Sequence, residues 1–253
     1  MASIVALQLY TVRDEAEKDF VQTIRNVAEI GYEGVEFAGY GKLSAPEVAA
    51  LLTETGLKAV GTHVGLDRLT NDFNREVDYC LSSNCPYLIV PSPGMDRNHL
   101  QEGNNLQRFI QQLNDFGSRA KSQGLTLGYH NHNFEFETII NGKPLYDHLV
   151  ADTDPTLVKL ELDTYWAAYA GVEVVPLIQQ LGERIITLHI KDMTPERTFT
   201  EVGDGTLDIA SYRKAASAIG DIALIVENDQ PAIPSLKSAR RSLENLRKDK
   251  NLS

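Results

Sequence analysis

The sequence predicts a single (β/α)8 barrel, and three observations support that prediction. Short aliphatic runs alternate with helical patterns eight times along the chain, the order expected of parallel strands joined by crossover helices. Most runs are continuously apolar, as in strands buried on both faces. The length of 253 residues suits one barrel and no linker marks a boundary, so we expect one domain over residues 1–253.

The first four units each pair an expected strand with an expected helix. Gly31 and Gly56 are natural helix stops, and Ser44 with Glu47 forms a capping-box pattern at the start of the second helix. The expected strand and helix ranges are 4–9 with 19–30, 34–37 with 44–56, 58–63 with 70–83, and 87–90 with 100–123.

The last four units continue the alternation to the C-terminal end. Asp208 is placed to cap the seventh helix, and the eighth helix completes the count. The expected ranges are the apolar start of 125–137 with 144–150, 157–163 with 174–181, 185–190 with 208–219, and 222–227 with 235–247.

Charge and cysteine content narrow the class of protein. The formal net charge of -11 opposes binding to a nucleic-acid backbone, and no run of Lys and Arg offsets it. Cys80 and Cys85 are too few for a disulfide framework and suggest buried thiols of a cytoplasmic protein. Residues 4–9 are too short to span a membrane and lack a basic leader, so we expect a first strand and no membrane association.

The fifth strand run ends in a dense group of polar residues. His130, His132, Glu135 and Glu137 lie within eight residues, which favours a metal or acid/base site over a strand that merely ends in solvent. Chemistry in barrels of this class sits at the carboxyl ends of the strands. The polar residues expected there are Gln8, Glu36, His63, Glu135, Asp163, His189, Lys191 and Glu227.

Seven motifs along nearly the whole chain resemble the xylose-isomerase-like TIM barrel superfamily. That superfamily includes sugar phosphate isomerases and epimerases, inosose and dehydroshikimate dehydratases, and endonuclease IV. The motifs identify the superfamily better than the reaction. They are GVEF (34–37), GTHVG (61–65), YHNHNFEF (129–136), LELDTYW (160–166), LHIKD (188–192), EVGDG (201–205) and VE (226–227).

The resemblance implies a divalent metal held by carboxylates from strands five, six and eight and a histidine from strand seven. Carried onto this chain, three ligands are Asp163, His189 and Glu227. Many relatives have a glutamate where this chain has His130, so we assign the strand-five ligand to Glu135, with His130 or His132 as the alternative. Three carboxylates and one imidazole favour Mn2+, Mg2+ or Co2+, with Zn2+ also suitable.

Neighbouring residues suit a small carbohydrate. His63, His132 and Lys191 can donate hydrogen bonds to hydroxyl groups, and Trp166 offers an apolar wall to a sugar ring. Structural alternatives remain, because Trp166 could plug the barrel rim and Lys191 could pair with Asp192 at the surface. Residues 203–205 are expected to form a plain turn, with a phosphate contact as the alternative.

The leading hypothesis is a metal-dependent sugar isomerase or epimerase that removes a proton beside a chelated carbonyl. Glu135 and Glu227 would flank the substrate as acid and base, and Lys191 or His132 would polarise its oxygen. The main alternative is a lyase or hydrolase of a keto-sugar or cyclitol, which needs only one base. An endonuclease IV-like enzyme and a non-catalytic sugar-binding barrel are remoter alternatives, and the family suggests a homodimer.

Overall fold

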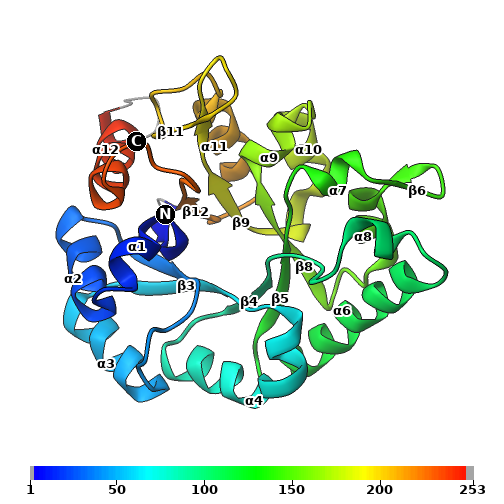
Figure 1. The fold of residues 1–253 in the computed structure, drawn as a ribbon, viewed down its shortest axis with the longest axis horizontal. Helices are drawn as coiled ribbons and strands as arrows, with labels where there is room; N and C mark the ends of the chain where they lie inside the picture. Colours follow the sequence, from blue (N-terminus) through cyan, green and yellow to red (C-terminus); the bar gives the residue numbers. More distant parts are fainter. Residues whose placement is uncertain (1–2, 249–253) are drawn as a thin grey trace.

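The computed structural model describes residues 3–248 and confirms the predicted (β/α)8 barrel. The parallel strands close into a ring (Figure 1). The ring has eight strands, and β1 pairs with both β2 and β12. Around the ring the order is β1-β12-β9-β8-β5-β4-β3-β2. The strands are β1 (Val5–Gln8), β2 (Gly34–Phe37), β3 (Lys58–His63), β4 (Tyr87–Val90), β5 (Thr126–His130), β8 (Val158–Asp163), β9 (Ile185–Ile190) and β12 (Ala223–Val226).

The larger helices lie outside the barrel and cover its strands (Figure 1). In α2, the Asp19 carboxylate accepts the Gln22 amide N–H at the start, and Gly31 at φ +104° ends the helix. The covering helices are α2 (Phe20–Ile30), α3 (Ala45–Thr55), α4 (Leu66–Ser82), α6 (Asn105–Ser122), α8 (Leu145–Asp152), α10 (Val174–Leu181), α11 (Ile209–Ser217) and α12 (Ser235–Lys248).

Two helix boundaries differ from the prediction. The third expected helix, α4, begins at Leu66 rather than near Thr70, and a non-helical Asp72 kinks it. The helix expected over 100–123 is two helices, α5 (Arg97–Leu100) and α6, with Gly103 between them at φ +53°. A residue with a left-handed backbone conformation cannot continue an α-helix, so the helix is interrupted at that glycine.

Short elements that the sequence did not predict lie mainly in the loops after the strands. These loops build the carboxyl end of the barrel, where the candidate site lies. They are η1 (Leu9–Val12), α1 (Arg13–Ala16), α7 (Phe134–Glu137), the hairpin β6 (Ile139–Ile140) with β7 (Lys143–Pro144), α9 (Thr164–Tyr169), η2 (Gly182–Arg184), and the pair β10 (Asp192–Met193) with β11 (Phe199–Thr200).

Among residues 3–248, no helix combines the length and the apolar character needed to cross a bilayer.

Candidate active site

The strands deliver a buried polar cluster to the carboxyl end of the barrel. Side chains two residues apart on a strand point to the same face, so Glu161 and Asp163 of β8 both face inward. Parallel pairing then sets Asp163 opposite His189 of β9. All three side chains are 0% exposed, which places ionisable groups where only partners or a bound ion can offset their desolvation.

The deeper part of the cluster is built around the Glu161 carboxylate. Its Oε1 lies 2.7 Å from His63 Nε2, 3.1 Å from His130 Nδ1 and 3.1 Å from His189 Nε2. Its Oε2 accepts a hydrogen bond from the Thr187 hydroxyl at 2.7 Å. Three imidazole nitrogens therefore converge on one oxygen from three different strands.

Glu36 of β2 closes this deeper cluster from the other side. Its Oε2 accepts a hydrogen bond from the Gln8 amide at 2.8 Å and lies 2.7 Å from His189 Nε2 and 3.2 Å from His63 Nε2. Burial opposes protonation of His63, but the charges of Glu36 and Glu161 outweigh burial and raise its pKa to about 10. His63 therefore carries a proton at neutral pH.

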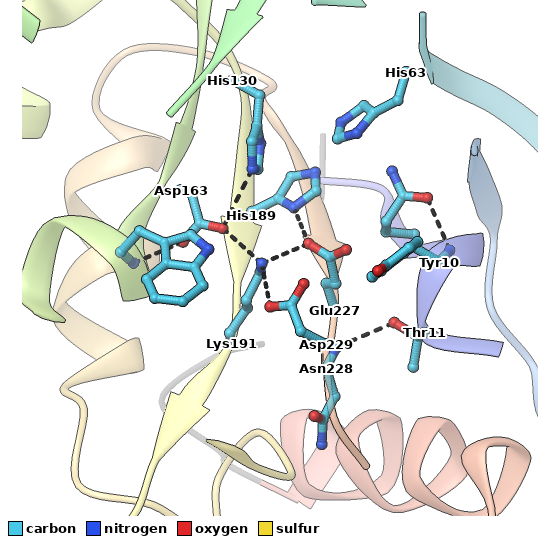
Figure 2. Close-up of polar contacts among 12 residues, drawn as sticks. Tyr10, Thr11, His63, His130, Asp163, His189, Lys191, Glu227, Asn228 and Asp229 are labelled. Atoms are coloured by element: carbon cyan, nitrogen blue, oxygen red, sulfur yellow. Dashed lines mark hydrogen bonds and ion pairs between the residues drawn. The ribbon is translucent and has the colours of Figure 1, made fainter. Parts of the chain in front are cut away.

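The upper part of the cluster is built around the Lys191 ammonium group, which is 1% exposed. Lys191 Nζ lies 3.0 Å from Asp163 Oδ2, 2.7 Å from Glu227 Oε2 and 2.7 Å from Asp229 Oδ2 (Figure 2). Burial lowers the pKa of Lys191, yet these carboxylates hold it well above the ordinary value. Lys191 thus faces the site rather than pairing with Asp192 at the surface.

Glu227 joins the two parts of the cluster. Its Oε2 lies 2.9 Å from His189 Nδ1, so the two ring nitrogens of His189 face different carboxylates. Burial raises the pKa of Glu227, but the Lys191 charge and the His189 hydrogen bond hold that pKa well below the ordinary value. Glu227 is a carboxylate at neutral pH, the form that a general base requires.

Two overlapping groups of side chains have the spacing of a metal site. One is Asp163, His189 and Glu227, and the other is His63, His130, Glu161 and His189; within each group one ligand atom per residue lies within 4.8 Å of the others. The first group contains three of the four ligands expected from the sequence. Asp163 Oδ2 is buried and accepts no hydrogen bond of regular geometry among the described residues, and it faces the Lys191 ammonium group at 3.0 Å and His130 Nε2 at 3.7 Å.

Glu135, the expected fourth ligand, lies outside both groups. The chain turns at α7, and the Glu135 carboxylate accepts hydrogen bonds from the Tyr129 hydroxyl at 2.8 Å and the His132 amide N–H at 2.7 Å. Burial raises the Glu135 pKa to about 8. At the strand-five position the structure places His130, whose Nε2 is 3.7 Å from Asp163 Oδ2.

A cavity of about 350 Å³ opens onto this cluster, a size at the lower end for small-molecule sites. His132 lines it, and burial lowers the His132 pKa to about 4, so its ring is neutral. Among residues 3–248, the buried His132 Nδ1 and Trp166 Nε1 have no hydrogen-bond partner. The Trp166 ring lies 5.6 Å from Lys191 Nζ, beside the site. The cavity is lined by Tyr10, Ala38, His63, Pro91, His130, His132, Lys191, Glu227 and Asp229.

The glycine-containing loop at 203–205 is a turn closed by the protein itself. The Asp192 carboxylate accepts hydrogen bonds from the backbone N–H groups of Gly203 at 2.9 Å and Gly205 at 3.1 Å. It also accepts those of Met193 at 2.9 Å and Leu207 at 3.1 Å. The backbone N–H groups that would bind a phosphate are therefore already bonded to the Asp192 carboxylate.

Sequence reasoning missed Glu161 and Asp229 and gave Glu36 no role. Glu161 carried a signal, because a carboxylate two residues before Asp163 in an aliphatic strand must share its inward face. Asp229 carried a weaker signal, two residues beyond Glu227 in a loop without regular alternation.

Fold and cluster together define a (β/α)8-barrel enzyme with a carboxylate and histidine site of the kind that binds a divalent metal. Residues 24–249 match the xylose isomerase-like TIM barrel family, and the chain belongs to that family.

Curated relatives of this chain are named inosose dehydratases. The protein from Geobacillus kaustophilus is 27% identical over 252 residues, covering 84% of this chain and 81% of that protein. The protein from Salmonella typhimurium is 24% identical over 269 residues, covering 91% of this chain and 88% of that protein.

Solved structures with the same fold carry several activities in their names. A sugar phosphate isomerase/epimerase from Parabacteroides distasonis has a TM-score of 0.86 at 21% identity, covering 100% of this chain and 96% of that one. A probable 3-DHS dehydratase from Bacillus anthracis has a TM-score of 0.76 at 14% identity, covering 99% and 100%. The IOLI protein, described with a bound zinc atom, has a TM-score of 0.72 at 14% identity, covering 96% of each chain.

Proposed function

We propose that this chain is a metal-dependent lyase of a keto-sugar or cyclitol, which removes the proton beside the ketone and eliminates an oxygen leaving group from the next carbon. The observation that carries the proposal is the position of Glu135, whose two oxygens are occupied by Tyr129 and His132. Epimerisation with two flanking carboxylates requires an acid opposite Glu227, and Glu135 was the candidate for that role. Elimination requires one base and one protonated acid. The dehydratase names of the relatives agree with this choice.

The site's own groups can divide the reaction between them. Glu227 is the base that removes the proton beside the ketone, and Lys191 stabilises the negative charge that develops on the ketone oxygen. His63 carries a proton, lines the cavity and can protonate the departing oxygen. His132 lines the cavity, and its ring Nδ1, which has no hydrogen-bond partner among the described residues, can bind a substrate hydroxyl group.

The donor set fits a divalent metal. We propose that Asp163, His189 and Glu227 hold it, with His130 at the strand-five position. When bound, the ion supplies a Lewis acid that polarises the ketone and acidifies the adjacent C–H. Replacing one carboxylate by a second imidazole shifts the preference toward Zn2+, Co2+ or Fe2+ over Mg2+.

Isomerisation or epimerisation is the second candidate, because it shares the first proton transfer and the P. distasonis structure carries that name. One experiment separates the two. The metal-loaded protein is incubated in D2O with a ketose, an inosose and a keto-glycoside, and the products are followed by NMR. An enone with loss of water or alcohol supports the lyase, whereas deuterium beside the ketone with inversion and no elimination supports the epimerase.

Glu227→Gln tests the proposed base. We expect a loss of about a hundredfold or more in turnover, because the amide cannot accept the proton. Asp208→Asn, at the cap of α11, is the matched control and should retain full turnover. Near-normal activity of Glu227→Gln with metal retained would assign the base to another residue.

A further inference from the structure

A second cavity adjoins the candidate active site on the side of β1 and β2. Its volume is about 670 Å³, compared with about 350 Å³ for the active-site cavity. Tyr10 and Ala38 line both cavities, so these two residues form a wall that the cavities share. The second cavity is formed by η1, α1, the start of α2 and the loop after β2, and a group held there would lie next to the active-site cavity.

Tyr10 presents a fixed aromatic ring at this shared wall. It is 43% exposed, and few large apolar side chains among residues 3–248 are as accessible. Its amide N–H donates to Gln8 Oε1 at 3.0 Å, and its carbonyl accepts from Arg13 Nη1 at 2.7 Å. The Arg13 guanidinium carbon lies 4.0 Å from the ring centroid, so one face of the ring is already covered.

Arg13 also connects the Tyr10 ring to the polar cluster of the candidate active site. Its Nη2 donates to the backbone carbonyl of Asp229 at 2.9 Å, and the Asp229 carboxylate binds Lys191 at 2.7 Å. These contacts fix the position of Tyr10 and Arg13 relative to Lys191, as expected for residues of one binding site.

The lining of the second cavity favours an uncharged ring. Its charges nearly balance, because three cationic side chains face two anionic ones, and Lys18 is paired with Glu15 at 2.8 Å. Arg13 already donates from both terminal nitrogens. No cluster of unused cations is present to hold a phosphate, whereas Leu9, Phe20 and Leu43 supply apolar surface.

We propose that this cavity holds the leaving group of the substrate, which is a keto-glycoside with an uncharged ring in its aglycone. The inference rests on the proposed lyase function and names its substrate class. Glu227 takes the proton beside the ketone, and the electron pair of that C–H bond forms a C=C bond. The glycosidic C–O bond at the next carbon breaks, and its oxygen receives a proton from His63. The products are an unsaturated keto-sugar and a neutral alcohol, so no oxidant or reductant is needed.

The test compares two substrates with similar leaving groups, the 3-keto derivatives of ethyl β-glucoside and 2-phenylethyl β-glucoside. Wild-type kcat/KM should be about tenfold higher for the phenylethyl substrate because its ring is buried against apolar surface. Ala16→Trp fills the second cavity without touching the first and should abolish that preference, leaving the ethyl substrate unchanged. Ala218→Trp, on the exposed end of α11, is the control and should retain the preference.

Equal wild-type kcat/KM for the two substrates, or an equal loss on both in Ala16→Trp, would overturn the inference. If neither substrate reacts, the proposed elimination fails, and binding of the unreactive ethyl and 2-phenylethyl β-glucosides tests the cavity by titration calorimetry. About tenfold tighter binding of the phenylethyl compound, lost in Ala16→Trp, would keep the cavity as a ring site. Equal binding would remove it.

Discussion

His130 occupies a position between the two parts of the polar cluster. It is 2% exposed, with Nδ1 at 3.1 Å from Glu161 and Nε2 at 3.7 Å from Asp163 Oδ2. Burial lowers its pKa well below the ordinary value, so the ring is neutral, the form in which histidine binds a metal. A small movement of His130 toward Asp163 would add it to the metal-site group of Asp163, His189 and Glu227, and His130 already belongs to the other group.

The strand-five ligand can be identified by comparing Glu135→Gln with His130→Ala. We expect Glu135→Gln to retain metal, because Glu135 is engaged with Tyr129 and His132 rather than the cluster. His130→Ala should lower affinity for Zn2+ or Co2+ by about tenfold or more through loss of a ligand. Metal content by mass spectrometry and affinity by chelator competition provide the measurement. Loss of metal from Glu135→Gln alone would restore Glu135 as the ligand.

The raised pKa of Glu135 predicts a pH dependence of stability. The unfolded chain loses this proton near pH 4.5, whereas burial keeps it on the folded protein to about pH 8. The folded state binds more protons across that window, so its free energy of unfolding falls as pH rises from about 4.5 to 8 and then levels. Glu135→Gln should remove part of this fall, on the order of a few kcal/mol. Urea unfolding at pH 5 and pH 8.5 measures it, and parallel wild-type and variant profiles would contradict it.

At the scale of elements, one carboxylate organises the loop after β9. The Asp192 carboxylate accepts hydrogen bonds from four backbone N–H groups, those of Met193, Gly203, Gly205 and Leu207, and so holds residues 203–207, which follow the short β10–β11 pair. Gly203 has a φ of +85°, which few other residues adopt without strain. The turn therefore depends on a side chain eleven or more positions away in sequence.

Asp192→Ala should destabilise the protein by about 3 kcal/mol, because several partly buried amides lose a charged acceptor. Asp192→Asn, which keeps one acceptor oxygen, should fall between Ala and wild type. Urea unfolding gives the free energies, and amide hydrogen exchange at Gly203 and Gly205 reports the loop directly. Unchanged exchange at both glycines in Asp192→Ala would show that the loop is held by other contacts.

At the scale of the whole molecule, the barrel interior is filled so closely that a methyl group added at Gly128 would meet side chains of the neighbouring strands. A methyl group added at Gly128 would lie 2.5 Å from Ile89 Cδ1 and 3.1 Å from Ile186 Cδ1. Gly128 and Ile89 pair directly across β5 and β4. The side chains of neighbouring strands thus fit as a layer across the barrel.

Gly128→Ala should lower the free energy of unfolding by about 1 to 3 kcal/mol through overpacking. Ile89→Val removes the Cδ1 atom in the way, so the double variant should recover most of the loss relative to Ile89→Val alone. Thermal and urea unfolding of the four proteins complete a double-mutant cycle. Additive losses would show that the strain lies elsewhere.

The sequence alone determined the barrel and the general position of its site. Aliphatic runs and helical patterns are local properties, and parallel strands necessarily bring their carboxyl ends to one face, so Asp163, His189 and Glu227 could be expected to meet. Helix ends were less predictable where a single glycine, such as Gly103, decides them.

Only the tertiary structure decided which polar groups share the centre of the site. A register shift between Leu160 and Glu161 sets Glu161 opposite Thr187, where it meets imidazoles from strands far away in sequence. Glu135 leaves the β-strand alternation before it reaches the barrel mouth, and its direction follows from the Tyr129 hydroxyl and the His132 amide. Periodicity sets side-chain direction within a strand, whereas beyond the strand end long-range contacts set it.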